Sequence, residues 1–529
     1  MGSVAQIERL DESVSAFEKI RQRRAASGKF VAGVAAVSNS DMFKQPTEGL
    51  PHAQDFTNYF SPESLSRTVC VLKKAAGYLK KEGIISLGGG LPSSEYFPFS
   101  EVALRVPMPP DFSEKSMQTV TIGKHDAHEG VSEYDLSIAL NYNQATGSAQ
   151  MMRFLTEHVE LIFNPPYADW QVCQTIGSTG ALEQAIRLLC DRGRGDAVVT
   201  EEYTYASALQ AIQPQGIRVF GVKMDEEGMI PSELDHLLSS WDAEARGCRR
   251  PHVLYTVPSG QNPTGATQSL ERRRHLYAVC QRYNVFVLED EPYYFLQMEP
   301  YLGKEFAQDA PTDHTTKSLE SFLGSLVPSY LSIDTDGRVM RMDSFSKILT
   351  PGARMGWITA SRQVIQGFLR HAEVSNQGPG GVSQIVLWKL LDETWGHEGY
   401  VAWLRHLRTS YTARRNTLLK ACDEVLPRDI VTWTPPAAGM FLWLKVDHTK
   451  HPDFPQKSIL EIEEEIFLGA IDDGVLCARG SWFRAEPETA PTELFFRTTY
   501  AAATEEAMAI AVCRLGAAIR RSFRCADKM

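Results

Sequence analysis

The stretch VMRMDSFSKILTPGARMGW, residues 339–357, decides the fold. It opens with a run, 339–342, that predicts a strand, and it continues into the hydroxyl-rich turn Ser344-Phe345-Ser346-Lys347. Open α/β sheets bind their ligands beyond the carboxyl ends of the strands. The stretch therefore predicts an α/β sheet that holds Lys347 at its ligand-binding edge.

The surrounding sequence fits such a sheet. From about residue 115 to 375, short apolar runs alternate with amphipathic helical patterns, which is typical of parallel strands covered by helices. Helices are expected, for example, over 181–191 and over 269–283, where Ser269 can cap the first turn. Together with 339–342, the expected strands are 171–176, 197–200, 252–257 and 285–289.

The length of 529 residues indicates two domains, because about 100 to 200 residues per domain is usual. Beyond Lys347 the pattern becomes more helical, over 401–421 and 503–523, with strands expected at 430–446 and 493–500. We therefore expect a smaller α+β domain beside the large one. The expected division is an N-terminal extension at 1–60, the N-terminal part of the small domain at 61–114, a large cofactor-binding domain at 115–375 with a surface-loop insertion at about 302–328, and the C-terminal small domain at 376–529.

Composition excludes several classes of protein. The chain is 43% hydrophobic and 22% charged, as in a folded protein, and its net charge of −11 argues against a nucleic-acid partner. Its nine cysteines lack CxxC spacing, so neither a zinc site nor a disulfide framework is indicated, and a reducing compartment fits best. Because no signal sequence and no apolar run of roughly 20 residues is present, we expect a cytoplasmic protein without a membrane segment.

Two segments could hold a phosphate. Gly177-Ser178-Thr179-Gly180 lies between an expected strand and helix, where backbone N–H groups and hydroxyls can face an anion, although such a turn can also be a simple helix cap. Near Lys347, hydrogen-bond donors for a phosphate are also offered by Ser344, Ser346 and Arg354. The P-loop lysine and a GxGxxG after a strand are both missing, so a nucleotide site is not indicated.

Three further turns bring polar side chains to the same edge. Asn262 lies in a rigid turn, Pro258–Gly265, where its amide can donate to a ligand. The run Leu288-Glu289-Asp290-Glu291 ends the next strand, and on its own it fits a magnesium site or a solvated strand end. Tyr205 offers an aromatic face, unless it belongs to the core.

Taken together and in this order, these motifs resemble those of the class I and II aminotransferases of fold type I. The resemblance extends from about residue 61 to 523 and is closest to the kynurenine/aminoadipate and fungal aromatic amino-acid aminotransferases. It also includes Ile85-Ser86-Leu87-Gly88-Gly89-Gly90-Leu91-Pro92, Leu140-Asn141-Tyr142 and Pro436-Ala437-Ala438-Gly439-Met440-Phe441-Leu442-Trp443. It implies a large domain with a mainly parallel central sheet flanked by helices, plus a smaller α+β domain.

The resemblance implies pyridoxal 5′-phosphate as cofactor, with Lys347 joined to it as a Schiff base and no metal. Asp290 would pair with the protonated ring nitrogen, which strengthens the ring as an electron sink. Asn262 and Tyr293 would bind the phenolic oxygen of the ring, and Tyr205 would stack on its face. The phosphate would be held by Ser178, Thr179, Ser344, Ser346 and Arg354.

The same resemblance implies how the substrate is bound. Arg497 would grip its α-carboxylate, Asn262 would contact it, and Gly89 lies in a segment expected to pass over it. Tyr142 matches a tyrosine that reaches the phosphate of a neighbouring subunit, which implies a homodimer with shared active sites. The side-chain pocket has three candidate lining residues, Phe441, Trp482 and Tyr142.

The implied reaction moves the amino group of an aromatic or long-chain L-amino acid to a 2-oxo acid such as 2-oxoglutarate. Lys347 would be the acid/base catalyst, and ping-pong kinetics would follow. Two alternatives stay open at this point. A pyridoxal-dependent lyase can use the same fold and motifs, and some regulators use an aminotransferase-like domain as a ligand sensor behind a basic winged helix. Residues 1–60 are short and acidic for such a helix.

Overall fold

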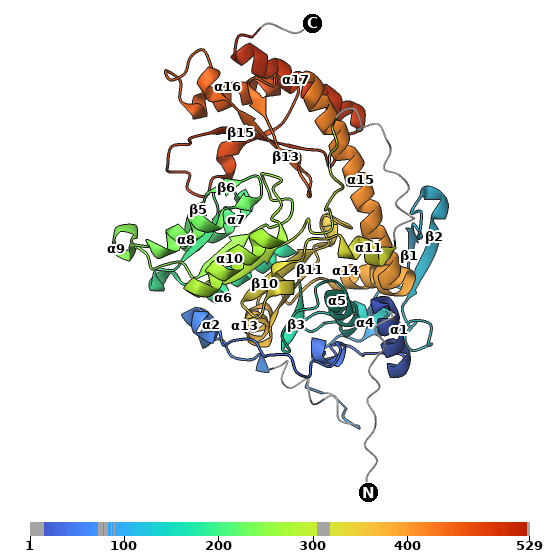
Figure 1. Ribbon diagram of the computed structural model, residues 1–529. Coiled ribbons are helices and arrows are strands. Elements are labelled where there is room, and N and C mark those ends of the chain that lie inside the picture. The colour runs from blue at the N-terminus through green and yellow to red at the C-terminus, as the bar shows by residue number, and fades with distance from the viewer. Residues whose placement is uncertain are drawn as a thin grey trace.

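A seven-stranded sheet forms the centre of the protein (Figure 1). A computed structural model describes residues 15–71, 78, 83–85, 87–88, 90–303 and 318–525. In spatial order the strands are β3 (Trp170–Thr175), β11 (Gly356–Ser361), β10 (Val339–Ser344), β9 (Phe286–Asp290), β8 (Val253–Thr256), β4 (Ala197–Glu201) and β5 (Arg218–Val222). Only β11 runs antiparallel to its neighbours β3 and β10. The predicted α/β fold with a mainly parallel sheet is confirmed.

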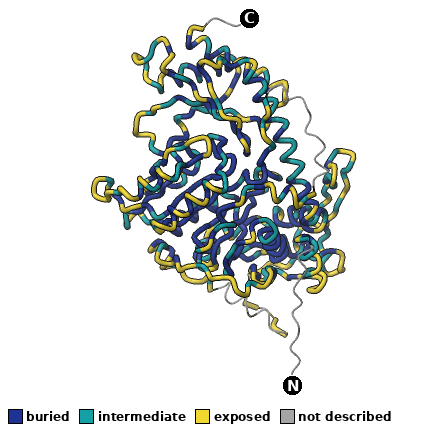
Figure 2. The backbone as a smooth tube through the Cα atoms, in the orientation of Figure 1, coloured by how far each residue is buried: buried dark blue, intermediate teal, exposed yellow. Residues whose placement is uncertain are grey.

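Helices cover both faces of this sheet. Every residue of β3, β4, β8, β9, β10 and β11 is buried, and Figure 2 shows this dark-blue centre. Strands buried on both faces read as apolar runs instead of alternating patterns, which is why most of them were predictable. The helices of this part are α2 (Pro62–Ser66), α4 (Leu136–Ala139), α5 (Ala149–Ile162), α6 (Ser178–Leu189), α7 (Ala206–Ile212), α8 (Pro231–Ser239), α9 (Ala243–Arg246), α10 (Leu270–Tyr283), α12 (Tyr330–Ile333), α13 (Arg362–Ala372) and α14 (Gly381–Trp388).

A smaller sheet lies beyond the carboxyl ends of the large one (Figure 1). Its order is β12 (Val431–Thr432), β13 (Phe441–Val446), β15 (Leu494–Thr499) and β14 (Ala478–Arg479), with α16 (Ile459–Asp472) and α17 (Glu505–Ser522) packed together beside it. The long helix α15 (Gly396–Val425) passes along both sheets and packs against α17. The single strand expected at 430–446 is wrong, because Pro435 and Pro436 interrupt it.

The described residues of the segment before the large domain add no strand to the smaller sheet. Within the described residues, β1 (Glu101–Val106) pairs only with β2 (Gln118–Gly123), in a separate hairpin beside α15 (Figure 1). The expected domain boundaries at 61, 115 and 376 stay predictions.

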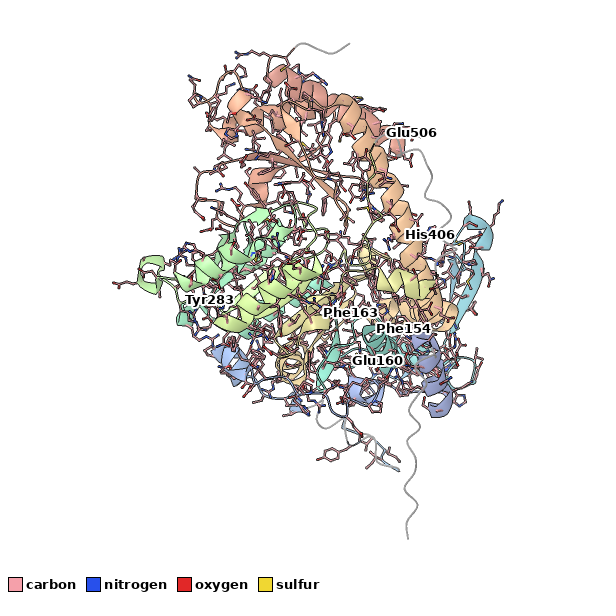
Figure 3. All side chains as sticks on the ribbon, viewed as in Figure 1. Phe154, Glu160, Phe163, Tyr283, His406 and Glu506 are labelled. Carbon is pink, nitrogen blue, oxygen red and sulfur yellow. The ribbon has the colours of Figure 1, made fainter. Side chains whose placement is uncertain are left out.

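The N-terminal segment packs onto the large domain. Helix α1 (Ala16–Ser27) begins at the capping residue Ser15 and buries Phe17 and Ile20. Glu160 of α5 is labelled in Figure 3. Its carboxylate accepts a hydrogen bond from Arg23 at 2.5 Å and another from the backbone N–H of Gln45. These contacts tie residues 15–45 to the folded body.

The expected insertion at about 302–328 lies partly outside the described residues. Its described end is not the expected surface loop: α11 (Leu319–Gly324) starts at Ser318, whose side chain accepts the N–H of Ser321, and it packs on α15. A serine N-cap supplies the missing bond of the first turn, which explains this short helix.

All nine cysteines are free thiols. No helix among the described residues combines the length and the apolar character that crossing a bilayer requires. In the same residues, no cluster of three His, Cys, Asp or Glu side chains is placed to hold a metal ion.

The two sheets meet at a close crossing of two glycines. Gly260 and Gly439 both have positive φ, +57° and +81°, and a Cβ on Gly439 would lie 2.7 Å from the Gly260 carbonyl oxygen. The adjoining Ala438 forms a β-bridge with Gln297 of the large part.

We expect Gly439→Ala to destabilise the protein by at least about 2 kcal/mol in chemical unfolding. Gly324→Ala, which meets nothing within 4 Å, is the control. Equal stability of the two variants would contradict this role of the crossing.

Candidate active site

A cavity of about 350 Å³ lies where the carboxyl ends of β8, β9 and β10 face the smaller sheet. Each predicted cofactor-binding residue except Tyr142 lines it, and so does Arg497 from β15. The structure therefore brings together residues that are more than 300 positions apart. The lining residues are Ser178, Thr179, Tyr205, Val257, Asn262, Asp290, Pro292, Tyr293, Ser344, Ser346, Lys347, Pro351, Arg354, Phe441 and Arg497.

Lys347 follows the end of β10 and is about half buried. Burial lowers the pKa of its amine, and the positive charges of Arg354 and Arg497 lower it further. An amine with a lowered pKa loses its proton at a lower pH and becomes a nucleophile more readily.

One end of the cavity is rich in hydrogen-bond donors. Arg354 donates to the hydroxyl of Ser346 at 3.4 Å, and Ser344 donates to the same oxygen at 2.8 Å. Gly177 has φ +94°, and a Cβ there would lie 2.8 Å from a guanidinium nitrogen of Arg354. Ser178 begins α6, whose first N–H groups have no partner within the helix. Only glycine leaves room for Arg354 against this helix start, and the arrangement suits an anion.

Asp290 ends β9 and is buried. Tyr255 donates its hydroxyl to Oδ2 at 2.8 Å, whereas Oδ1 has no hydrogen-bond partner. Burial raises the pKa of Asp290 to about 7, while the hydrogen bond from Tyr255 and the nearby hydroxyl of Ser178 act in the opposite direction. A buried carboxylate oxygen without a partner is costly, so a donor from a ligand would stabilise it.

The other two carboxylates of this run do not reach the cavity. Glu289 and Glu291 are buried, Arg273 lies 3.3 Å from Glu291, and Arg341 lies 3.4 Å from Glu289. Successive side chains of a strand point to opposite faces, which separates them from Asp290. The magnesium site and the solvated strand end considered for this run are therefore both wrong.

Asn262 and Tyr293 both contact the small sheet. Asn262 accepts a hydrogen bond from Arg497 of β15, and the ring of Tyr293 lies 5.8 Å from that of Phe441 of β13. Both line the cavity, and an interaction with Asn262 lowers the pKa of the Tyr293 phenol, although burial raises it by more. Tyr205, the N-cap of α7, also lines the cavity. The ring of a planar ligand could thus meet an amide, a phenol and an aromatic face.

Arg497 is the cation at the opposite end. Its guanidinium lies 4.3 Å from the ring centre of Phe441 and 4.6 Å from that of Phe483, and it donates to Oδ1 of Asn262 at 2.7 Å. Burial lowers its pKa. Within the described residues no carboxylate forms an ion pair with it, so this cation is free to bind an anionic ligand.

Comparison with known proteins agrees with this site. The family model for aminotransferases of class I and II matches residues 139–515. An aromatic amino acid aminotransferase of Schizosaccharomyces pombe is 42% identical, covering 89% of this chain and 99% of that protein. An L-tyrosine:2-oxoglutarate aminotransferase of Serpula lacrymans is 32% identical, covering 83% and 85%. The crystal structure of aminotransferase Aro8 from Candida albicans matches with a TM-score of 0.83 and 38% identity, covering 90% and 100%.

This chain belongs to the class I and II aminotransferases. The family and the enzyme class predicted from the motif around Lys347 are thereby confirmed. Aminotransferases of this family depend in general on pyridoxal phosphate. The residues present fit that group. Oδ1 of Asp290, which has no hydrogen-bond partner, suits a protonated ring nitrogen. The absence of a side chain at Gly177 leaves room for the guanidinium of Arg354, which suits a phosphate.

Not every predicted site residue of the aminotransferase lies in the cavity. Gly89 lies outside the described residues. Tyr142 is 55% exposed and away from the cavity of its own chain, so its role stays a prediction. Trp482 was one of three candidates for lining the substrate pocket, but its indole packs edge-on against Phe467 of α16, outside the cavity.

Sequence reasoning missed two contacts in this aminotransferase, that of Tyr255 with Asp290 and that of Phe483 with Arg497. Tyr255 lies in an expected strand and reads there as core. Phe483 follows Trp482 in a segment without a motif, so no sequence signal distinguished the two rings.

The raised pKa of Asp290 predicts a pH-dependent stability in the cofactor-free aminotransferase. An acid whose pKa is raised by folding stabilises the folded state only when protonated, and this stability is lost as the pH rises from about 4 to about 7. We therefore expect Asp290→Asn to raise the melting temperature of the cofactor-free form at about pH 8, with no gain near pH 4. Calorimetry across this range tests it, and a gain independent of pH would contradict it.

Proposed function

We propose that the enzyme binds pyridoxal phosphate through Lys347 and transfers the amino group of an aromatic or long-chain L-amino acid to a 2-oxo acid such as 2-oxoglutarate. The names of the similar Schizosaccharomyces pombe and Serpula lacrymans proteins support the choice of amino acid and acceptor. Apolar lining by Phe441, Val257 and Pro292 also suits a large apolar side chain.

Arg497 carries this proposal. Its guanidinium has two aromatic rings against it and a single polar contact, to Asn262, so it can take a carboxylate without breaking an ion pair of the described residues. A bidentate bond between a guanidinium and a carboxylate fixes orientation as well as affinity. An α-carboxylate held there would place the rest of an amino acid beside Lys347 in the same cavity.

Bound pyridoxal phosphate would supply a carbonyl carbon for the amino group and a ring that accepts electrons from the substrate. Lys347 would hold the cofactor until an amino acid replaces it, and its free Nζ would then remove the proton from the substrate α-carbon. The lowered pKa of this amine suits a base near neutral pH. Asp290, Asn262 and Tyr293 would orient the ring, and Tyr205 would lie against its face. Ser178, Thr179, Ser344, Ser346 and Arg354 would bind the phosphate.

A donor panel tests the reaction. Purified enzyme is given pyridoxal phosphate, 2-oxoglutarate and each of the common L-amino acids, and glutamate, ammonia and 2-oxo acids are measured. We expect glutamate with aromatic and long-chain donors. Ammonia or side-chain loss without glutamate would favour the lyase, and ligand binding without turnover would favour the sensor. Borohydride reduction and peptide mapping would place the pyridoxyl label on Lys347.

We also propose a homodimer in which Tyr142 reaches the neighbouring site. Tyr142 is exposed, and so are Tyr96 at 85% and Val382 at 59%, on adjoining elements: the short helix Ser94–Tyr96 contacts α4, and α4 contacts α14. Clustered exposed apolar side chains mark interaction surfaces.

Hybrid dimers test this sharing. We expect Tyr142→Phe and Lys347→Ala each to weaken cofactor binding, whereas in a mixed dimer one site holds both wild-type residues. Mixing the two variants should therefore restore tight binding of pyridoxal phosphate in about half of the sites of each mixed dimer. A monomeric mass by light scattering, or no recovery on mixing, would contradict the proposal.

A cytoplasmic location is proposed as well. Nine free thiols, seven of them not exposed, suit a reducing compartment. Imaging of a fluorescent fusion tests it.

A further inference from the structure

Tyr255 lies beneath the cavity and is fully buried in β8. β8 and β9 are parallel neighbours, with Tyr255 opposite Leu288, two residues before Asp290. Across this register the Tyr255 hydroxyl reaches Oδ2 of Asp290 at 2.8 Å. Tyr255 does not line the cavity, so it can act on a ligand only through Asp290.

The surroundings of Asp290 make this hydrogen bond important for the ionisation of its carboxyl group. The groups that act on the carboxyl are Ser178 from α6, Tyr255 from β8, Asp343 from β10 and Glu201 from β4. Two of these are acids that oppose its ionisation, and the other two are hydroxyls. The cation on the neighbouring strand β10, Arg341, is engaged elsewhere, since it bonds Asp343 at 2.8 Å. The hydroxyl groups of Ser178 and Tyr255 are therefore what favours the ionised form of Asp290.

We propose that Tyr255 is a positioning residue: its hydroxyl holds Asp290 ionised and turned so that the free Oδ1 faces the ring nitrogen of the cofactor. The inference rests on the proposed binding of pyridoxal phosphate in this cavity. With Oδ2 fixed by Tyr255, only Oδ1 is left to accept a proton-bearing nitrogen. Loss of the hydroxyl would favour a neutral acid, which cannot keep that nitrogen protonated.

The chain offers a matched control in Tyr277 and Asp334. Tyr277 of α10 also donates its hydroxyl to a buried carboxylate at 2.8 Å, and burial raises the pKa of Asp334 to about 6. Neither residue lines the cavity. Tyr277→Phe therefore removes the same kind of bond at the same kind of site, without touching Asp290.

The experiment compares cofactor-free wild type, Tyr255→Phe and Tyr277→Phe. Each is titrated at neutral pH with pyridoxal phosphate and with the analogue in which a C–H group replaces the ring nitrogen, and binding is followed by quenching of tryptophan fluorescence. Thermal unfolding of each cofactor-free protein reports folding. A monofluorinated tyrosine at position 255, which keeps the hydroxyl and makes it a stronger donor, serves if Tyr255→Phe does not fold.

We expect Tyr255→Phe to weaken pyridoxal phosphate about tenfold, the effect of about one pKa unit at Asp290. Tyr277→Phe should stay within about twofold of wild type. With the analogue, wild type and Tyr255→Phe should bind alike, because the analogue has no ring nitrogen for Asp290 to hold. The fluorinated tyrosine should bind pyridoxal phosphate more tightly than wild type below neutral pH.

Two results would overturn the inference. One is equal pyridoxal phosphate affinity in Tyr255→Phe and Tyr277→Phe, and the other is an equal loss of affinity for both ligands in Tyr255→Phe, which would mean a distorted cavity. Failure of the proposed function is distinguishable, because wild type itself would then not bind pyridoxal phosphate.

Discussion

Lys347→Ala is expected to lower kcat by about 10⁴-fold, because it removes both the covalent anchor and the base that moves the α-proton. No other lysine lines the cavity among the described residues, so no neighbour can replace it. The measurement is single-turnover formation of the 2-oxo acid from a preferred donor. Added methylamine should restore part of the rate, since a small amine can enter the space left by the side chain.

The control is Lys445→Ala. Lys445 lies on β13, outside the cavity, in an exposed ion pair with Glu493 at 3.0 Å. Exposed pairs contribute little stability, about 1 kcal/mol or less, so its activity should match wild type. Activity of Lys347→Ala within about tenfold of this control would refute the assignment of Lys347.

Much of the site could be predicted because each contributing strand is an apolar run followed by a polar turn. Such a run marks a buried parallel strand, and the carboxyl ends of these strands meet at one edge. Lys347, Asn262 and Asp290 follow this rule, and the structure places all three in one cavity. The family resemblance added Arg497, which lies on the other sheet and which no strand-end rule would bring to this edge.

The remaining features depend on packing that sequence patterns do not encode. β11 begins at Gly356 and lies antiparallel between β3 and β10, and its pairing with β3 joins residues that are 181 to 191 positions apart in the chain. The grouping of Glu289 and Glu291 with Asp290 was wrong, although the two-residue period of a strand would have separated them. Trp482 and Phe483 are adjacent aromatic residues, and only the fold decides which of them packs on Arg497.

Arg497→Gln is expected to lower kcat/KM for amino acids by roughly 150-fold, about 3 kcal/mol, because a partly buried charged partner of the substrate carboxylate is removed. Glutamine can keep a hydrogen bond to Asn262 but carries no charge. An amine that lacks the carboxylate should react equally slowly with both enzymes, so the preference for amino acids over such amines should disappear. Initial rates with an aromatic amino acid and its decarboxylated amine measure this.

A second measurement distinguishes the loss of substrate-carboxylate binding from a general disturbance of the protein structure. The positive charge of Arg497 helps to lower the pKa of Lys347, so its removal should raise that pKa and move the capture of pyridoxal phosphate by Lys347 to higher pH. The matched control is Arg428→Gln, since Arg428 also stacks on an aromatic ring, 3.9 Å from the centre of Trp433, outside the cavity. Arg428→Gln should leave both the substrate preference and the pH profile unchanged. If Arg497→Gln still prefers amino acids over amines, the carboxylate is bound elsewhere, and the orientation of substrate proposed for this cavity is wrong.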